Sequence, residues 1–128
     1  MTTTNRNEWV NYGDVNPLEH GGIFVMKDKD VENAFHIVKV TNLEHATGDT
    51  GYLIDTAYID LDCWNTDNAK DFAGLDETDP PELYAIAVLD YYGPEECSGE
   101  SIVYDTVGET IAGLCGYDIT VHAEIEEE

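Results

Sequence analysis

Basic residues are scarce in this chain. Its 128 residues include five Lys and Arg against 28 Asp and Glu, which gives a formal net charge of −23 at pH 7. Proteins bind DNA and RNA chiefly through Lys and Arg, which release counterions from the phosphates. A nucleic-acid backbone repels a chain with so few of them. The composition therefore excludes direct nucleic-acid binding.

Long apolar runs are missing as well. No stretch approaches the roughly 18–20 apolar residues of a membrane span, and Met1 to Arg6 lack the basic and apolar regions of a signal peptide. We expect a protein of the cytosol without membrane contact. Cys63, Cys97 and Cys115 are odd in number and widely spaced, which favours reduced thiols over a disulfide framework or a metal knuckle.

The motifs of common enzymes are also absent. The four histidines lack the i, i+4 spacing of a helical zinc pair, and no Ser stands in a Gly-x-Ser-x-Gly turn. The glycines at 21–22 and 48–51 lack the lysine of a phosphate-binding loop. Among 28 acids some carboxylate pair always suggests acid/base chemistry, so such pairs alone indicate nothing. We predict no catalytic residue and no cofactor.

One acidic segment partly fits a calcium-binding loop. Asp60, Asp62, Asn68 and Asp71 occupy ligand positions of the pattern, but Trp64 stands where the fifth-position ligand belongs. This mismatch favours ordinary loop acids, and we predict no metal site.

Acidic residues are abundant and unevenly distributed. Residues 71–128 hold sixteen carboxylates and no Lys or Arg. Charge this one-sided destabilises a compact state, and it attracts cationic surfaces over a Debye length of about 8–10 Å in physiological salt. The chain is nevertheless 42% hydrophobic and includes eight Tyr, whereas disordered acidic chains are poor in aromatic residues. We expect it to fold.

The length suits one domain. We predict a single acidic α+β domain over residues 1–128, with a partly ordered N-terminal segment at 1–20 and an acidic tail at 126–128. Strands followed along the chain by helices favour this class over alternating βαβ units. The expected architecture is an antiparallel β-sheet packed against two or three helices.

The first half carries the strand signals. Residues 23–26 and 34–40 are rich in β-branched and aromatic residues and predict a hairpin around a polar turn. The longer run 52–61 is apolar on both faces and predicts a central strand. Asp55 interrupts one of those faces, and we expect its carboxylate to be exposed. Residues 44–51 are expected to form a loop.

The second half carries the helix signals. Thr66 and Gly74 bound a short helical turn. Asp79-Pro80-Pro81-Glu82 predicts a capping box and a helix to about Tyr91, although the apolar body at 83–89 is also compatible with a buried strand.

Two more elements are expected near the C-terminus. Thr106 and Glu109 form a second capping box, and Val103, Val107, Ile111 and Leu114 recur at helical spacing, which predicts a helix at 107–114. The alternation from Tyr117 to Ile125 predicts a last strand of the sheet.

Carboxylates at alternate strand positions lie about 6.7 Å apart on one face. The sequence places three such sets, at Asp28/Asp30, at Asp60/Asp62 and at Glu124/Glu126/Glu128. Rows of this kind can stand in for backbone phosphates. They also serve solubility alone, and both interpretations stay open.

In its composition the chain resembles the DNA-mimic inhibitors that phages and plasmids encode against restriction and CRISPR nucleases, which are small, folded and extremely acidic. The resemblance covers the whole chain and includes no motif, so no residue is carried over from it. It implies a non-enzymatic, cytosolic inhibitor that occupies the nucleic-acid-binding surface of a basic partner, such as a nuclease. The alternative is an acidic binding or accessory domain of a salt-adapted organism or phage, in which the acids serve solubility only.

The lysine-free half supplies the candidate partner-binding surface. We place it in the loops that flank the Pro80 helix and along the last predicted strand. The candidate residues are Asp76, Glu77, Asp79, Glu95, Glu96, Glu100, Glu124 and Glu126.

Overall fold

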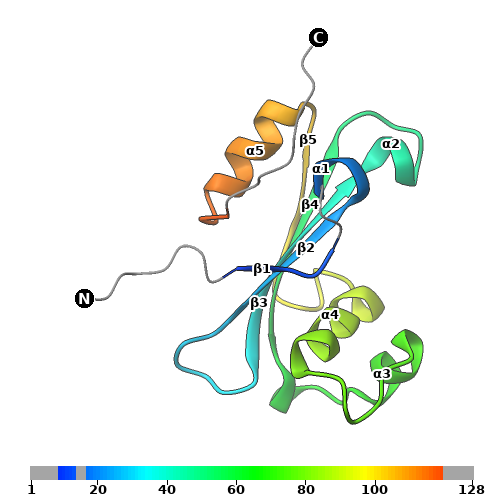
Figure 1. Ribbon diagram of the computed structural model, residues 1–128, viewed down its shortest axis with the longest axis vertical. Coiled ribbons are helices and arrows are strands. Elements are labelled where there is room, and N and C mark those ends of the chain that lie inside the picture. The colour runs from blue at the N-terminus through cyan, green and yellow to red at the C-terminus, as the bar shows by residue number, and fades with distance from the viewer. Residues whose placement is uncertain (1–8, 14–16, 120–128) are drawn as a thin grey trace. The chain divides into compact units, whose positions relative to one another are not determined.

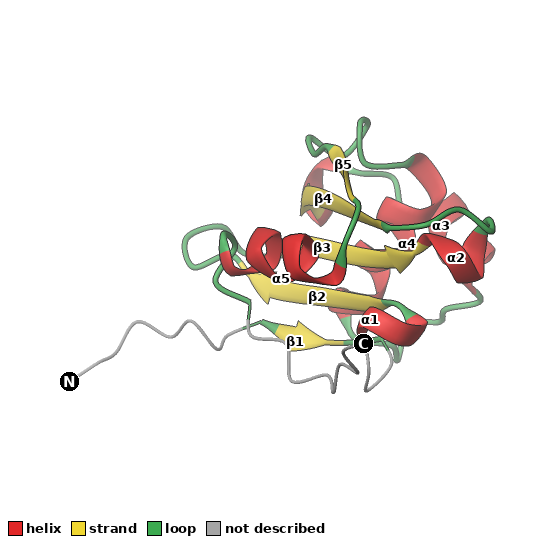
Figure 2. Cartoon of the chain, turned by 90° about the horizontal axis from the view of Figure 1, so that it is seen from above, coloured by secondary structure: helices red, strands yellow, loops and turns green. Residues whose placement is uncertain are grey.

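The computed structural model describes residues 9–13 and 17–119. Five strands form one antiparallel sheet in the order β1-β2-β3-β4-β5 (Figure 2). The strands in this part of the chain are β1 (Val10–Asn11), β2 (Gly22–Lys27), β3 (Ala34–Asn42), β4 (Tyr52–Asp60) and β5 (Ser101–Tyr104). The helices are α1 (Pro17–His20), α2 (Leu43–Ala46), α3 (Asp67–Ala73), α4 (Pro81–Tyr92) and α5 (Val107–Cys115), with a 3-10 turn at Leu61–Cys63 (Figure 1). The predicted α+β class is confirmed.

The chain divides into two compact units, each built from separate segments. Unit 1 takes the described parts of 1–24, 39–54 and 102–128, and unit 2 takes 25–38 and 55–101. β2, β3 and β4 each begin in one unit and end in the other.

Unit 1 contains α1, α2 and α5. Asn42 begins α2 by accepting a hydrogen bond from the Glu44 amide (2.9 Å), and its side-chain amide donates to the carbonyl of Leu18 at the α1 segment (3.2 Å). α5 lies close to β5 at Gly113, where an added Cβ would stand 2.7 Å from the Tyr104 ring. Leu114 of α5 is fully buried. A small residue at 113 therefore lets the helix approach the strand.

Unit 2 contains α3 and α4, which pack against each other (Figure 1). α4 buries Ala85 to Leu89, which explains why this stretch is apolar on every side. The residues are helical, so the alternative of a buried strand is excluded. Strand residues of this unit such as Phe35, Ile37 and Ile59 are also buried, each no more than 1% exposed.

Several predicted elements are confirmed. The hairpin of β2 and β3, the interior strand β4 and the helices α3, α4 and α5 all form close to their expected bounds. Gly74 ends α3 in the left-handed conformation, at φ 71°. The Thr106 hydroxyl accepts the Glu109 amide hydrogen bond (3.1 Å), as its cap pattern predicts.

The predicted capping box at α4 is wrong. The residue before the helix is Pro80, which offers no side-chain acceptor, and α4 begins at Pro81. Asp79 Oδ2 instead accepts a hydrogen bond from the amide of Asp76 (2.9 Å). Two consecutive prolines moved the helix start by one residue, and the Asp79 carboxylate stabilises the preceding turn.

Other local predictions also need correction. Val103 lies in β5 rather than in the helical register of α5, and the loop predicted at 44–51 contains most of α2. Asp55 is half-buried rather than exposed, and Ser101 Oγ donates to it at 2.5 Å. Tyr117 lies in a turn after α5, where its amide donates to Leu114 (2.9 Å). The rest of that predicted strand, from residue 120, is outside the described residues.

Candidate protein-interaction surface

Three predicted surface residues lie in the turn before α4. The Asp76 carboxylate accepts hydrogen bonds from the amide and hydroxyl of Thr78, at 2.9 and 2.5 Å. Tyr84 of α4 donates its hydroxyl hydrogen bond to the Asp76 carbonyl (2.6 Å). The Thr78 hydrogen bonds lower the pKa of Asp76. Asp76 and Asp79 therefore shape this turn, and Glu77 is exposed beside them.

Three more lie in the segment after α4, and this segment is tied to β4. The Thr56 amide donates to the Glu100 carbonyl (2.9 Å) and the Tyr58 amide to the Cys97 carbonyl (3.0 Å). The Glu100 amide in turn donates to the Thr56 hydroxyl (3.1 Å). The segment contributes only backbone atoms to these bonds, so the exposed carboxylates of Glu95, Glu96 and Glu100 are displayed on an ordered segment.

The two acidic groups lie at opposite ends of α4. This helix has twelve residues and is therefore about 18 Å long. The prediction that both groups form one surface requires a partner that spans this length. Glu124 and Glu126 are outside the described residues.

The two groups also differ in their electrostatic relation to α4. The N-terminal end of a helix carries partial positive charge and the C-terminal end partial negative charge. Acids near Pro81 are therefore favourable, whereas Glu95 and Glu96, which follow Tyr92 by three and four residues, gain nothing from the dipole. Within the described residues neither of these two carboxylates has a hydrogen bond or an ion pair. The charges of Glu95 and Glu96 therefore have no role in holding the fold together. This makes them stronger candidates for partner binding than the acids before α4.

An aromatic cluster lies near that same C-terminal end of α4, and no sequence pattern predicted it. The rings of Phe72 and Tyr91 have centroids 5.5 Å apart, Tyr91 and Tyr92 are 4.9 Å apart, and Tyr92 and Trp64 are 4.7 Å apart. Phe72 is 62% exposed and Tyr91 44%. Both residues lie outside the apolar run at 83–89. Large aromatic residues outside a predicted core segment are the sequence signal that could have revealed the cluster.

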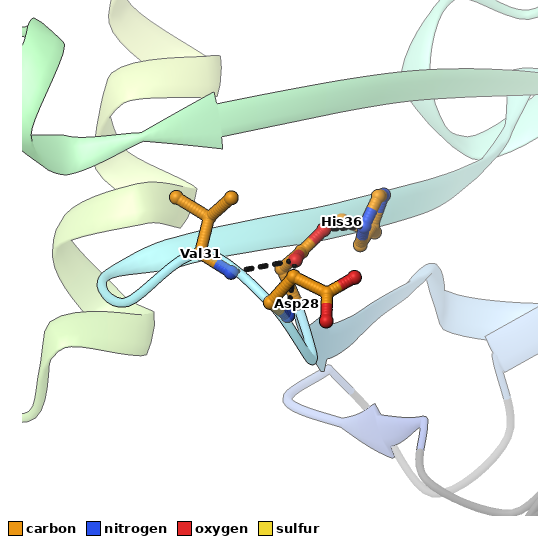
Figure 3. A network of polar contacts seen from close by, with 4 residues as sticks. Asp28, Val31 and His36 are labelled. Atoms are coloured by element: carbon orange, nitrogen blue, oxygen red, sulfur yellow. Dashed lines mark hydrogen bonds and ion pairs between the residues drawn. The ribbon is translucent and has the colours of Figure 1, made fainter.

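The predicted carboxylate rows on strands do not form in the described part of the chain. Asp28 follows the end of β2, and Asp60 is the last residue of β4. Asp28 Oδ1 accepts the amides of Asp30 (2.8 Å) and Val31 (2.9 Å), and Asp28 Oδ2 lies 2.9 Å from His36 Nε2 (Figure 3). Asp60 Oδ1 accepts the amide of Asp62 (3.1 Å). Short acids at or just after strand ends close turns, and their carboxylates are used locally.

Unit 1 has a cavity of about 410 Å³ beside α1 and α2. Its lining includes His20, Lys39 and His45, and the two imidazole rings have centroids 6.1 Å apart. Across residues 9–13 and 17–119, no three His, Cys, Asp or Glu side chains are placed to hold a metal ion together. The same ranges contain no helix with the length and apolar character of a membrane span.

No protein-family model matches this chain, and no curated protein or solved structure matches it either.

Proposed function

We propose that the protein is a non-enzymatic inhibitor that covers the DNA- or RNA-binding surface of a basic protein, in competition with the nucleic acid. A nuclease is the partner class that best fits, because its substrate channel is lined with cations that recognise phosphates. This is the mode of action of the DNA-mimic inhibitors that the composition resembles.

One observation carries the proposal. Glu95 and Glu96 are exposed on a segment that is hydrogen-bonded to β4, beyond the C-terminal end of α4, where the helix dipole does not favour negative charge. The fold holds them in place and gains nothing from their charge. Fixed carboxylates without internal partners are available to the Lys and Arg side chains of another protein. Electrostatic complementarity of this kind mainly increases the association rate.

The test is a competition assay on purified nucleases. A fluorescein-labelled DNA duplex is bound to a restriction endonuclease or to a guide-loaded CRISPR nuclease, and the protein is titrated in while anisotropy and cleavage are followed. We expect displacement of the duplex, loss of cleavage and an affinity that falls steeply with salt. Simultaneous binding of the protein and the duplex, or equal affinity in 1 M salt, would contradict the proposal.

A matched pair of variants assigns the effect to a site. E95K/E96K reverses two charges of the candidate surface, and D30K/E32K reverses two exposed charges in the turn between β2 and β3. Both variants change the net charge equally, so the long-range field weakens to the same extent. We expect E95K/E96K to slow association by about tenfold, within the range over which steering acts, and D30K/E32K to have a smaller effect. Asp28 is unsuitable as a control because its carboxylate closes the turn.

A further inference from the structure

The aromatic cluster Trp64, Phe72, Tyr91 and Tyr92 is an exposed apolar surface that the core does not use. Phe72 is the most exposed large hydrophobic residue in the described part of the chain. Trp64 and Tyr92 are half-buried, and the four rings form a linear series of contacts, Phe72 to Tyr91, Tyr91 to Tyr92 and Tyr92 to Trp64, with centroid separations of 4.7 to 5.5 Å. Rings that are already packed lose little freedom on binding, and aromatic residues are enriched at the energetic centres of interfaces.

Acidic residues flank the cluster along the chain. Phe72 follows Asp71, Tyr91 follows Asp90, and Glu95 and Glu96 come shortly after Tyr92. No Lys or Arg occurs in the sequence after Lys70. An acidic aromatic surface is complementary to a basic one, because Arg guanidinium groups pair with carboxylates and stack on aromatic faces.

The combination of flat rings and fixed carboxylates has a counterpart in nucleic acids. In a duplex the faces of the bases are covered by their neighbours, and a protein meets phosphates and base edges. In a single strand the base faces are accessible, and proteins bind them by stacking with aromatic and Arg side chains beside a basic groove. Exposed rings next to carboxylates therefore correspond to unstacked bases next to phosphates.

We infer that the Phe72–Tyr91 face is the anchor of the interface, and that its partner is a protein surface that binds single-stranded nucleic acid by stacking and by phosphate contacts. This inference rests on the proposed function and specifies its partner class. Phe72 and Tyr91 stand in for bases, and Glu95 and Glu96 stand in for the adjacent phosphates.

The experiment compares two competitions. In the first, the protein is titrated against a fluorescein-labelled thymidine oligonucleotide bound to a single-stranded-DNA-binding protein of the OB-fold type. In the second, it is titrated against a labelled duplex bound to a restriction endonuclease. We expect displacement at lower concentration in the first. Displacement of the duplex alone would overturn the inference and leave the proposed function intact, whereas displacement in neither assay would overturn both.

Ring variants test the anchor. F72L/Y91L keeps apolar side chains and removes the flat faces, and we expect it to weaken binding by at least about fivefold per ring, the lower end of stacking losses. The Tyr91→Phe variant keeps the ring and should bind as the wild type does. V31A/V103A removes two other exposed apolar side chains and serves as the control, with circular dichroism of every variant to confirm folding.

The salt dependence of binding distinguishes the contribution of the aromatic rings from that of the carboxylates. F72L/Y91L should keep the salt dependence of binding while lowering the affinity at every salt concentration, because stacking involves no counterion release. E95K/E96K should make the salt dependence shallower. If F72L/Y91L binds as tightly as the wild type while E95K/E96K does not, the aromatic anchor is wrong and the electrostatic function stands.

Discussion

Asp28 Oδ2 lies 2.9 Å from His36 Nε2, while Oδ1 of the same carboxylate accepts the amides of Asp30 and Val31 (Figure 3). One side chain thus closes the turn between β2 and β3 and also joins it to the first residues of β3. The His36 ring in turn lies 5.0 Å from the ring of Tyr58 on β4, measured between centroids. In a chain with 28 acids, this carboxylate has a structural role that its neighbours Asp30 and Glu32 lack.

The first prediction concerns the pH dependence of that role. The amide of Asp30 first, and then His36 and the amide of Val31, lower the pKa of Asp28 below its ordinary 3.8. The ionised carboxylate therefore stabilises the fold at pH above 3.8, and this contribution disappears as the pH falls through the lower folded value. Asp28→Ala should lower the melting temperature at pH 7 more than Asp28→Asn, which keeps one acceptor oxygen for the turn.

Urea unfolding of wild type and Asp28→Ala at several pH values provides the measurement. The difference in stability should be constant near neutral pH and should shrink in acid, where the wild-type carboxylate is protonated. A difference that stays constant down to the most acidic pH would show that the side chain acts through packing and not through its charge.

The second prediction concerns the net charge. Folding brings like charges together, so added salt should raise the melting temperature between roughly 0.05 and 1 M, over which the Debye length falls from above 10 Å to 3 Å. Mild acidification towards pH ~5 should act in the same direction, because it reduces the net charge. D30K/E32K carries less negative charge and should show a flatter salt dependence.

Differential scanning fluorimetry at several salt concentrations measures this effect. A melting temperature indifferent to salt would mean that the acids are too dispersed to repel one another. Loss of the folded far-UV circular dichroism spectrum at 0.05 M salt would instead favour the salt-adapted alternative, since such a protein depends on screening to fold.

The third prediction concerns the acidic segment after α4. A Cβ at Gly99 would stand 1.6 Å from the carbonyl oxygen of Thr56, and both groups belong to backbone that cannot yield easily. Gly99→Ala should destabilise the protein by about 3 kcal/mol, at the upper end of overpacking costs. Because Glu95 and Glu96 depend on this segment for their placement, binding to a partner should weaken as well.

Gly108 offers a matched control for the same substitution. It lies in α5, where the nearest atom to an added Cβ, the Thr106 hydroxyl oxygen, is 4.0 Å away. Gly108→Ala should stabilise the protein by about 0.5–1 kcal/mol through helix propensity and a less flexible unfolded chain. Chemical denaturation of the two variants side by side measures both effects, and equal stability of the two would contradict the close approach at Gly99.

The fourth prediction concerns the three thiols. Cys97 is buried, and burial, with Glu96 nearby, raises its pKa to about 11, whereas Cys63 and Cys115 are exposed. The charge of Asp60 raises the pKa of Cys63 as the largest cause. Since the thiolate is the reactive form, a disulfide reagent at pH 8 should label Cys115 first, Cys63 more slowly and Cys97 only after denaturation.

Labelling followed by peptide mass spectrometry identifies the order. Rapid modification of Cys97 in the native protein would show that the segment after α4 opens readily, which would remove the basis for an ordered display of Glu95 and Glu96.

Sequence patterns predicted the fold class and most of the elements. This was possible because apolar runs and helix caps are signals that depend on residues close together in the chain. The β-branched runs at 34–40 and 52–61 and the Thr106 cap depend on neighbours along the chain, and these predictions are confirmed. The first capping box was wrong because two successive prolines offer two helix starts, and periodicity does not choose between them. β5 was missed because a four-residue strand with half-exposed residues has too short a pattern to recognise.

The sequence by itself determined the excess of carboxylates, the absence of Lys and Arg after Lys70 and the apolar body of α4. These properties follow from the number and order of the residues alone, without any contact between distant parts of the chain. Only the tertiary structure decided which carboxylates are used internally, as Asp28 and Asp76 are, and which are displayed without partners, as Glu95 and Glu96 are. It also brought Phe72 of α3 against Tyr91 of α4. Hydrogen bonds and ring contacts depend on distances of a few ångströms between elements, and such distances are set by packing rather than by any spacing along the chain.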